Sequence, residues 1–499
     1  MTDTQTPVRY ASPTGRWVLA AAVAGSSIAM LDATVVNVAL PTVGADLDMG
    51  FSGLQWVING YLVTLAALIL LGGALGDLYG RRRIFVAGTV FFAVASLACG
   101  LAPNGPTLVA ARAVQGVGGA MLTPASLAII QSSFHPDDRG RAIGAWSGLG
   151  GVAAAIGPFL GGWLVGSVSW RAIFLINLPV AAVVALVAQR HVPESSAPAR
   201  AGWHPDLAGG LLSALGLAGL TYALIEFPAR GWSSPVIRGA VALAVLGFAG
   251  FLTVEMRERH PMLPLGIFRS LRFSGANLAT FAIYGALGGF FFLFAIHLQR
   301  ALDYSPLEAG AAGLPITLIM LGHSARAGRM ATYTGPRLPM TLGPFVMAVG
   351  LWLARGIGPG ADYLTDVLPP VLVFAIGLVH TVAPLTTTVL AAAPPEHAGV
   401  ASGVNNAVAR AAGLVAVAVL PSLAGLGGDI VPDPQTLTDG FAQSCSIAAG
   451  ALALGGLISL LTVGKDKPEA PALGSEHHCS VDGPPLRPAE SHWGCAEAA

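Results

Sequence analysis

The chain has 499 residues, of which 54% are hydrophobic and only 10% are charged. This composition excludes a soluble globular protein and predicts an all-α integral membrane protein. The 26 basic residues balance the 26 acidic ones, so the net charge gives no reason to expect a nucleic acid as a partner. We expect isolated thiols and no metal site, because the cysteines have neither metal-ligand nor disulfide spacing: Cys99, Cys445, Cys479 and Cys495.

Apolar stretches long enough to cross about 30 Å of hydrocarbon recur along the whole chain. After a polar tail, predicted to be disordered (1–15), six of them predict a first helix bundle over 16–190: 17–41, 55–75, 84–102, 107–131, 142–166 and 171–189. A polar, proline-rich linker (191–206) precedes an inserted pair over 207–256, at 207–226 and 237–256. Six more predict a second bundle over 273–464, before a second disordered tail (465–499): 274–297, 310–326, 339–355, 367–392, 400–421 and 441–463. The sequence therefore predicts fourteen transmembrane helices, with thirteen as the alternative because 310–326 and 339–355 are short.

Two groups of residues occur twice in the chain. Three positions of the stretch Gly73 to Arg83 (GALGDLYGRRR) return 255 residues later: Gly73 as Gly328, Gly80 as Gly335 and Arg82 as Arg337. Asp77 is the exception, because Thr332 replaces it. A second group returns 259 residues later: Pro136 as Pro395, Gly140 as Gly399 and Gly144 as Gly403. Two echoes at nearly one offset predict a duplicated half, so that the two six-helix bundles are pseudo-symmetric.

The basic residues favour one orientation in the membrane. With both termini in the cytoplasm, five of the 26 fall in outer loops: Arg171, Arg230, Arg238, Arg300 and Arg355. Two fall inside spans, Arg112 and Arg410, which leaves 19 on the cytoplasmic side. Cytoplasmic loops carry an excess of Lys and Arg, so we expect a multi-pass protein of the inner (cytoplasmic) membrane with both termini cytoplasmic.

Four motifs in chain order resemble those of the major facilitator superfamily. The loop from Gly73 to Arg83 is similar to its signature loop, and the stretch from Leu108 to Ala120 (LVAARAVQGVGGA) is similar to its second motif. The stretch from Leu31 to Pro41 (LDATVVNVALP) resembles the fourteen-span drug:proton antiporter branch. The fifth span resembles the antiporter motif, with Ala153 where that pattern has a glycine: Gly144, Gly157, Pro158, Gly161 and Gly162.

This resemblance implies a secondary active transporter that exports hydrophobic drugs or antibiotics in exchange for protons, by alternating access. The alternative is a proton-coupled or facilitated transporter of one metabolite. No phosphate-binding Gly-Lys-Ser/Thr loop or enzyme motif occurs in the sequence, so we expect neither ATP-driven transport nor an enzyme. The expected partners are a small-molecule substrate, protons and the lipid bilayer; we expect a monomer without a cofactor, the proton being the coupling ion.

Ionisable residues inside membrane spans are costly and mark function by default. Asp32 lies nine residues before Pro41, and Arg112 lies seven residues after Gly105. At 1.5 Å per residue, both lie roughly 10–14 Å below the outer boundary of the membrane. Equal depth predicts a facing pair, and we expect Asp32 and Arg112 to couple transport to protons. The alternative is a static ion pair that holds the bundle together.

Arg410 lies near the middle of the thirteenth span, without an obvious acidic partner in its half of the chain. We expect it to contact carbonyl groups, the substrate or Asp32, and helix packing is the alternative. The predicted substrate cavity contains the three charged residues and four polar ones: Asp32, Asn37, Trp56, Asn59, Arg112, Gln115 and Arg410. Tyr61 and Gln299 are secondary candidates for the same cavity.

The stretch Gly73 to Arg83 is expected to act as a cytoplasmic gate, in which Asp77 lies at a helix start and pairs with an arginine. The gate combines this loop with its echo: Gly73, Asp77, Gly80, Arg81, Arg82, Gly328, Gly335 and Arg337. The alternative is a topology anchor.

The glycines of the fifth span are expected to let two helices pack backbone to backbone. The inserted pair is expected to face lipid outside both bundles, with Glu226 and Glu255 reaching water at the span ends.

Overall fold

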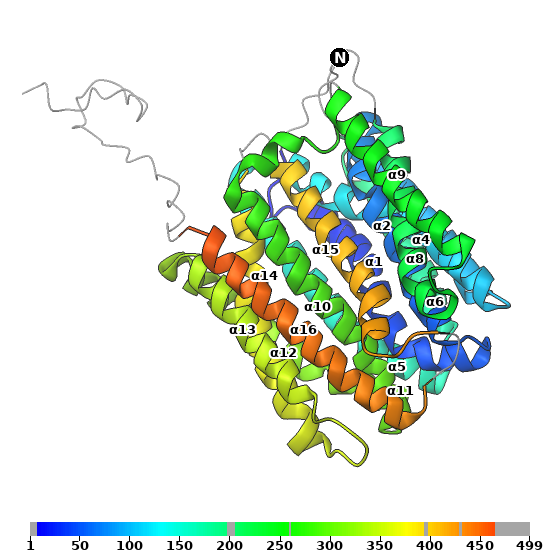
Figure 1. Ribbon diagram of the computed structural model, residues 1–499. Coiled ribbons are helices and arrows are strands. Elements are labelled where there is room, and N and C mark those ends of the chain that lie inside the picture. Colours follow the sequence, from blue (N-terminus) through cyan, green and yellow to red (C-terminus); the bar gives the residue numbers. More distant parts are fainter. Residues whose placement is uncertain (1–6, 197–204, 259–260, 394–397, 429–431, 465–499) are drawn as a thin grey trace, which may run out of the picture.

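The computed structural model describes residues 7–196, 205–258, 261–393, 398–428 and 432–464, and over these ranges the chain is a bundle of long helices without a β-strand (Figure 1). The helices of the first half are α1 (Pro13–Asp46), α2 (Phe51–Tyr79), α3 (Arg81–Gly100), α4 (Gly105–Ser133), α5 (Pro136–Ser167), α6 (Ala172–Leu175) and α7 (Asn177–His191). The inserted pair is α8 (Leu207–Arg230) and α9 (Pro235–Arg257). After a 3-10 turn, η1 (Leu265–Arg269), the second half contains α10 (Leu271–Ala301), α11 (Pro306–Ala312), α12 (Leu314–Thr334), α13 (Arg337–Ala354), a π turn, η2 (Tyr363–Val367), α14 (Leu368–Ala391), α15 (Ala398–Leu423) and α16 (Pro434–Thr462).

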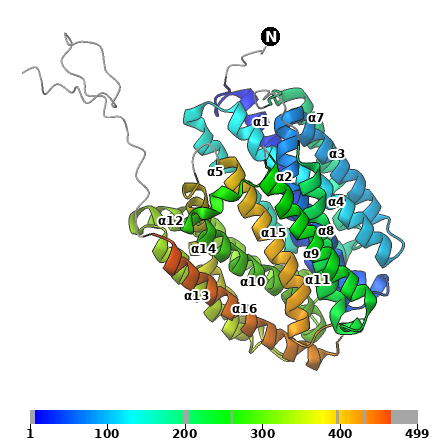
Figure 2. The ribbon, with the colours of Figure 1, turned by 45° about the horizontal axis from the view of Figure 1, so that its top comes forward.

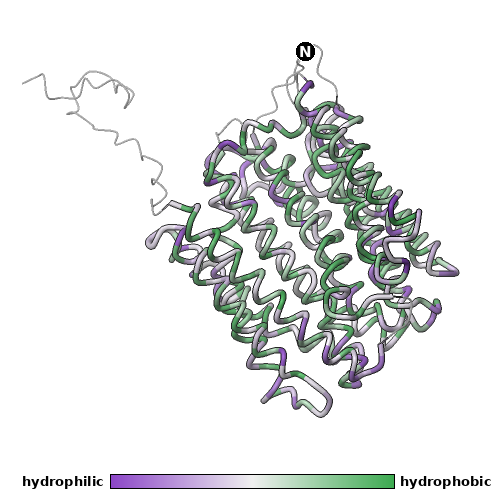
Figure 3. The backbone as a smooth tube through the Cα atoms, viewed as in Figure 1, coloured by the Kyte–Doolittle hydropathy of each residue, from purple (hydrophilic) through white to green (hydrophobic). Residues whose placement is uncertain are grey.

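Apolar residues cover most of the length of these helices, and polar residues gather toward their ends (Figure 3). Thirteen of the described helices are long and apolar enough to span a membrane. Helix α12 is the long helix that does not meet these criteria. The predicted span 310–326 is divided between α11 and α12, and the second half of α12 carries Arg326 and Arg329. Thirteen, the alternative count, is the number that meets the criteria of length and composition among the described residues, and α12 packs along α14 as a further member of the bundle.

The N-terminal residues differ from the expectation of a disordered tail. The backbone N–H of Val8 donates to Ser133 O at 2.8 Å, and the N–H of His135 donates to Val8 O at 3.1 Å. The side chain of Ser12 then caps α1 by accepting from the N–H of Gly15. Residues 7–12 are thus held against the α4–α5 connection. The rest of the predicted first tail (1–6) and the predicted tail at 465–499 lie outside the described residues.

The two predicted bundles are two groups of packed helices (Figure 2). In the first, α4 packs against α2 and α3, and α1 packs against α5 and α7; in the second, α10 packs against α15 and α16, and α13 packs against α14. Gly80 and Gly335, which the sequence echo aligns, each join two helices with a positive φ, of 107° and 76°. Residues with a Cβ are strained in that conformation, so the duplicated glycine has one physical reason in both halves.

The halves form hydrogen bonds with each other at one end of the bundle, which we call the far end; it carries the α1–α2 connection. Arg300 Nη2 of α10 donates to Pro41 O of α1 at 3.0 Å. The N–H of Ser52 donates to Gly428 O at 3.1 Å. A Cβ added to Gly162 of α5 would lie 2.2 Å from Pro306 O of α11. Backbone therefore meets backbone between α5 and α11 at this end.

The opposite end, which carries the α2–α3 connection, is called the motif end, and there the same face of α5 is uncovered. Gly144 precedes Gly162 by 18 residues, about five helical turns, so both point in one direction. A Cβ added to Gly144 would meet no atom within 4 Å, and the same holds for Gly148 and Gly151. The structure is thus closed along α5 at the far end and open along α5 at the motif end.

The inserted pair covers the seam between the halves from outside. Helix α8 packs against both α2 and α15, whereas α9 packs chiefly on α8. Leu217 of α8 shares a cluster with Val63 of α2 and Leu414 of α15. The pair lies along one side of the bundle in Figure 1. Helix α8 therefore contacts both halves, an arrangement that hydropathy alone does not specify.

Candidate functional site

Five polar side chains from four helices form a buried hydrogen-bond network in the first half, which we call the Asp32 network: Asp32 of α1, Ser96 of α3, Arg112 and Gln115 of α4, and Asn177 of α7. Arg112 Nη1 donates to Asp32 Oδ2 at 2.5 Å, and Gln115 Nε2 donates to Asp32 Oδ1 at 2.9 Å. Asn177 Nδ2 donates to the same Oδ1 at 3.3 Å. Asp32 thus accepts from three donors, and the guanidinium of Arg112 balances its charge.

Neighbouring helices hold Arg112 in place. Arg112 Nε donates to Val57 O of α2 at 3.1 Å, and its guanidinium lies 4.4 Å from the centre of the Tyr61 ring. Gln115 follows three residues later on the same face of α4, and its Oε1 accepts from Arg112 Nη1 at 2.5 Å. The guanidinium is therefore oriented by a carbonyl, an amide and an aromatic ring as well as by Asp32.

The network lies within the first half and is closed to solvent, since Asp32 and Arg112 are each 1% exposed. The sequence predicted the contact between Asp32 and Arg112 from their equal depth. It did not predict Ser96, which accepts from Gln115 Nε2 at 2.6 Å, nor Asn177, which donates to Asp32 Oδ1. Both are neutral polar residues in apolar stretches. Such residues commonly form hydrogen bonds between membrane helices, so their position in the sequence could have indicated this role.

Trp56 was predicted to line the cavity, and the structure corrects this. Its Nε1 donates to Glu226 Oε1 of α8 at 3.1 Å, and its ring lies 5.9 Å from the ring of Tyr222 of α8. Trp56 therefore faces the inserted pair. The pattern of apolar residues along α2 could not reveal this, because it does not say which neighbour covers which face.

The two glutamates of the inserted pair also differ from the prediction that they reach water. The Glu226 side chain is only 12% exposed and pairs with Arg230 at 2.9 Å in addition to Trp56. Glu255 is 3% exposed, and its Oε2 accepts from the N–H of Leu263 at 3.1 Å. Each carboxylate therefore accepts a hydrogen bond from a neighbouring segment of the protein in place of water: Glu226 of α8 from Trp56, and Glu255 of α9 from Leu263.

The remaining neutral residues of the predicted cavity are separate from the Asp32 network. Asn37 Nδ2 donates within its own helix, to Ala33 O at 3.4 Å. Asn59 is completely buried, and neither polar atom of its amide has a hydrogen-bond partner. The Tyr61 hydroxyl is likewise buried without a partner. Arg410 is partly exposed and lies on α15, across the seam from α2.

The stretch Gly73 to Arg83 forms an internal clamp. Arg81 Nε and Nη2 donate to Asp77 Oδ1 at 2.9 and 2.8 Å. Asp77 lies in the last turns of α2 and does not cap α3, which corrects the prediction that it lies at a helix start; the N-cap of α3 is Gly80, without a side-chain bond. The pairing with an arginine is as predicted. Both partners belong to the first half.

Glu194, in the predicted linker, also contacts this loop. Its Oε1 accepts from the N–H of Arg82 at 3.1 Å, and its Oε2 lies 3.5 Å from Arg82 Nε. A Cβ added to Gly80 would lie 2.7 Å from Glu194 Oε1, so Gly80 is needed for space as well as for its φ. In the echoed loop, Gly328 has open space around it, and Arg337 Nε is buried without a hydrogen-bond partner. The two loops are thus similar in backbone and different in charge pairing.

The antiporter motif of α5 packs tightly over part of its length. A Cβ added to Gly157 would lie 2.0 Å from Thr34 Oγ1 of α1, and one added to Gly161 would lie 3.0 Å from Val35 of α1. Pro158 O lies 2.2 Å from the position of a Cβ on Gly310 of α11. Backbones pack closely, as predicted, at Gly161 and between Pro158 and Gly310, whereas Gly157 lies against the Thr34 side chain and Gly144 lies in the open part of α5.

Two glutamines connect the halves at the far end. Gln55 Nε2 of α2 donates to Val417 O of α15 at 2.7 Å, and Gln299 Nε2 of α10 donates to Val38 O of α1 at 2.9 Å. Val417 O is available because its helical donor would be residue 421, and Pro421 has no N–H. The sequence named Gln299 as a secondary candidate and missed Gln55. The feature of the sequence that could have indicated this bond is the proline inside α15, because it leaves a helix carbonyl free to accept from a glutamine of another helix.

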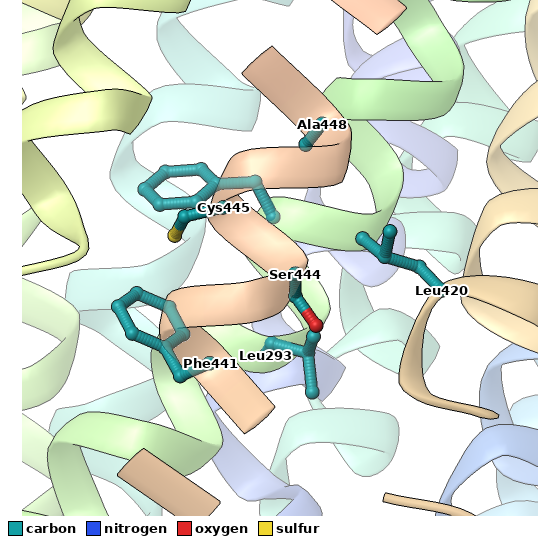
Figure 4. Close-up of a pocket in the computed structure, with 7 residues that line it drawn as sticks. Leu293, Leu420, Phe441, Ser444, Cys445 and Ala448 are labelled. Carbon is teal, nitrogen blue, oxygen red and sulfur yellow. The ribbon is translucent and has the colours of Figure 1, made fainter. Parts of the chain in front are cut away.

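Figure 4 shows a pocket in the second half, between α10, α15 and α16. It is lined by Leu293, Leu420, Phe441, Ser444, Cys445 and Ala448, together with Phe290. The pocket has no room for a water molecule. It is therefore a packing gap in an aromatic core and not a substrate site.

A model of the Major Facilitator Superfamily matches residues 22–418. The chain is 36% identical over 421 residues to the tetracenomycin C resistance and export protein of Streptomyces glaucescens, with 83% of this chain and 77% of that protein covered. It is also 36% identical over 451 residues to the puromycin resistance protein of Streptomyces alboniger, with 89% of each chain covered. The methylenomycin A resistance protein of Bacillus subtilis is 36% identical over 412 residues, with 82% of this chain and 87% of that protein covered.

Two solved structures show the same fold at low sequence identity. A POT family transporter in complex with a thioalcohol-conjugated peptide matches with a TM-score of 0.67 and 12% identity, over 89% of this chain and 95% of that chain. A bacterial homolog of the human lysosomal transporter Spinster, in an inward-facing and unoccupied conformation, matches with a TM-score of 0.60 and 18% identity, over 91% and 97%. These likenesses concern the fold alone.

Proposed function

Because this chain belongs to the Major Facilitator Superfamily, and is therefore a membrane transporter, we propose that it exports drugs or antibiotics in exchange for protons. The relatives named above are resistance and export proteins, which supports a small organic substrate and the outward direction. The transporter acts as a monomer in the cytoplasmic membrane. It uses the proton as its coupling ion and no cofactor. Both termini lie in the cytoplasm, so the motif end faces the cytoplasm and the far end faces outward.

Asp32 carries the proton. In the state described, Asp32 accepts from Arg112, Gln115 and Asn177, an arrangement that suits a carboxylate which has released its proton. A proton arriving from outside binds one carboxyl oxygen of Asp32 and removes its charge. Arg112 then loses its ionic partner, which favours rearrangement of α1 against α4. Release of the same proton toward the cytoplasm restores the ion pair, so each cycle moves the proton inward without any redox step.

The contacts between the halves suit alternating access. Gln55 and Gln299 hold the far end closed, whereas α5 is uncovered near Gly144. In the proposed orientation this state receives substrate from the cytoplasm. The opposite state closes α5 and α12 at the motif end, and the clamp between Asp77 and Arg81 opens or re-pairs there.

The single observation that carries the proposal is the buried pair of Asp32 and Arg112, fully hydrogen-bonded inside one half of a transporter. Buried ion pairs contribute little net stability on average, so a cost of this kind favours a functional role over a static support. The second candidate is a proton-coupled transporter of a single metabolite, because the same pair would serve it equally well.

The test uses purified protein in proteoliposomes that contain a pH-sensitive dye. Tetracenomycin C, puromycin and methylenomycin A, applied one at a time with an imposed proton gradient, should each be tested for drug movement and proton movement together. Drug transport that collapses when an uncoupler dissipates the gradient supports the proposal. Drug transport that continues unchanged without a gradient contradicts proton exchange, and transport of none of a broad drug panel favours the metabolite alternative.

A further inference from the structure

Arg410 points at the middle of α2 from the other half of the molecule. Gly403, Arg410 and Val417 are spaced seven residues apart on α15, about two turns each, so they share one face. A Cβ added to Gly403 would lie 2.7 Å from Leu70 of α2, and Val417 O accepts from Gln55 of α2. Arg410 lies midway between these two contacts, and its side chain therefore projects toward the centre of the seam between the halves.

Two hydroxyl groups lie within electrostatic reach of the Arg410 guanidinium. They belong to Tyr61 of α2 and Tyr284 of α10. Tyr61 also lies beneath Arg112 of the Asp32 network, whereas Arg410 comes from the opposite half. The buried Tyr61 hydroxyl has no hydrogen-bond partner.

A second unpaired polar group lies on the face of α2 that meets α15, roughly opposite to the face from which Tyr61 contacts Arg112. Asn59 follows Gln55 by four residues and therefore lies above it on the face that meets α15. Its amide is completely buried, and neither its nitrogen nor its oxygen has a partner. Buried polar groups almost always have hydrogen-bond partners, so the unpaired Asn59 amide, on the face of α2 that meets the helix of Arg410, indicates a place where another polar group belongs.

No carboxylate in the described part of the chain forms an ion pair with Arg410. Asp32 is already occupied by Arg112, and Glu226 is occupied by Arg230 and Trp56. With the charges of Asp32 and Arg112 cancelling, the centre of the seam carries one uncompensated positive charge. An unpaired charge at this depth is expensive, and a bound anion removes that cost.

We propose that Arg410 binds an acidic group of the transported compound, so that the substrates of this protein are amphipathic organic anions with a carboxylate or an ionised enol or phenol. This rests on the proposed export function and adds a substrate class to it. The guanidinium presents a planar fork that matches two oxygens of such a group. The Asn59 amide, on the face of α2 that meets α15, can supply further hydrogen bonds, and apolar side chains of the seam cover the rest of the molecule.

The competing explanation is that Arg410 replaces Arg112 as the partner of Asp32 in the other transport state. The two explanations differ in one respect. A state-dependent ion pair affects every substrate alike, whereas an anion-binding arginine affects only substrates that carry the acidic group.

The test compares rhodamine B, which has a free carboxylate, with rhodamine B ethyl ester, in which that carboxylate is blocked. Cells that express the wild type, Arg410→Gln, Arg410→Lys or the control Arg355→Gln are loaded with each dye, and efflux is followed by fluorescence. Arg355 is exposed at the far end over the ring of Trp352, so its replacement should change neither rate. In the wild type the acid should leave at least tenfold faster than the ester. Arg410→Gln should reduce that preference by about tenfold, which corresponds to about 1.4 kcal/mol, and Arg410→Lys should restore part of it.

The outcomes separate the two levels of the argument. Equal loss of acid and ester in Arg410→Gln, or recovery of transport when Asp32 and Arg410 are exchanged, overturns the inference in favour of the ion-pair explanation. Wild-type export confined to the ester and other cationic drugs also overturns it, yet leaves drug export intact. Absence of efflux of both dyes and of every antibiotic in a panel grouped by charge contradicts the proposed function itself, and the inference with it.

Discussion

The two halves have similar helix packing but very different cores. The first half contains the Asp32 network, in which an ion pair is fully hydrogen-bonded. The corresponding region of the second half is aromatic: the ring of Phe290 lies 5.0 Å from Phe294 and 5.2 Å from Phe374. The ring of His297 stacks on Phe441 at 4.2 Å, and its Nε2 lies 2.9 Å from Ile357 O.

This difference shows that the fold does not depend on what fills the core. Helices of small and apolar residues pack in the same way around a charge network and around stacked rings. The duplicated glycines preserve the backbone, whereas the polar residues diverged. In the mechanism proposed above, the first half carries the group that responds to protons, and Arg410 lies in the second half at the seam between them.

The largest expected effect comes from removing Asp32, the proposed proton-carrying group of the first half. Asp32→Asn keeps the shape of the side chain and removes its ability to exchange a proton, so drug-dependent proton release in proteoliposomes should be lost. Asp46→Asn is the matched control, because Asp46 ends the same helix and pairs with Arg171 at 2.7 Å near the surface. Proton exchange at the wild-type rate in Asp32→Asn would remove the functional distinction between the halves.

Arg112→Lys should be nearly as damaging, although it preserves the charge. Lysine cannot donate to Val57 O and Asp32 at once as the guanidinium does. A lost hydrogen bond to a charged group costs about 1.5–3 kcal/mol, so transport should fall by at least tenfold. Arg171→Lys, measured in the same assay, should retain most activity. Full activity of Arg112→Lys would mean that only charge, and not the fork geometry, matters in the first half.

Asp77→Asn compares the clamped loop of the first half with its echo, where Thr332 occupies the position. Arg81 loses its ionic partner, so the motif end should close or open more slowly. We expect transport of every substrate to slow by a similar, several-fold factor, measured as rates for at least three compounds of different charge. A changed order of preference among them would place this loop in substrate selection.

Phe290→Leu tests the aromatic core of the second half. The change removes ring contacts with Phe294 and Phe374, each worth about 1 kcal/mol, and should lower the melting temperature by a few degrees. The pH dependence of transport should stay the same, because no proton-carrying group is touched. A shifted pH profile would contradict the division of roles between the two cores.

The smallest effect is expected from Gln55→Leu at the far end. The change removes the bond to Val417 O, worth about 1 kcal/mol, and should raise the population of the state open at that end by about fivefold. Gln299→Leu should act similarly from the other half, through the loss of its bond to Val38 O. Labelling of single cysteines near the far end by a water-soluble thiol reagent measures the shift. Unchanged labelling in both variants would show that other contacts hold this end closed.

The order of the helices, the duplication and the depth of the Asp32–Arg112 pair follow from the sequence by itself. Span length is set by the thickness of the bilayer, and depth follows from a fixed rise per residue, so both can be counted along the chain. The repeated glycines could be read in the same way, because a positive φ constrains residue type locally.

Apart from the pair of Asp32 and Arg112, only the tertiary structure decided which side chains face each other. Trp56 was expected in the cavity and instead meets Glu226 of α8, since an apolar helix gives no sign of which neighbour covers a given face. Ser96 and Asn177 joined the Asp32 network, and Glu194 joined the loop of Arg82, through contacts between segments far apart in the chain. Helix α12 is a member of the bundle, although its hydropathy is low, because it packs on α14. Whether a helix joins a bundle depends on its neighbours as well as on its composition.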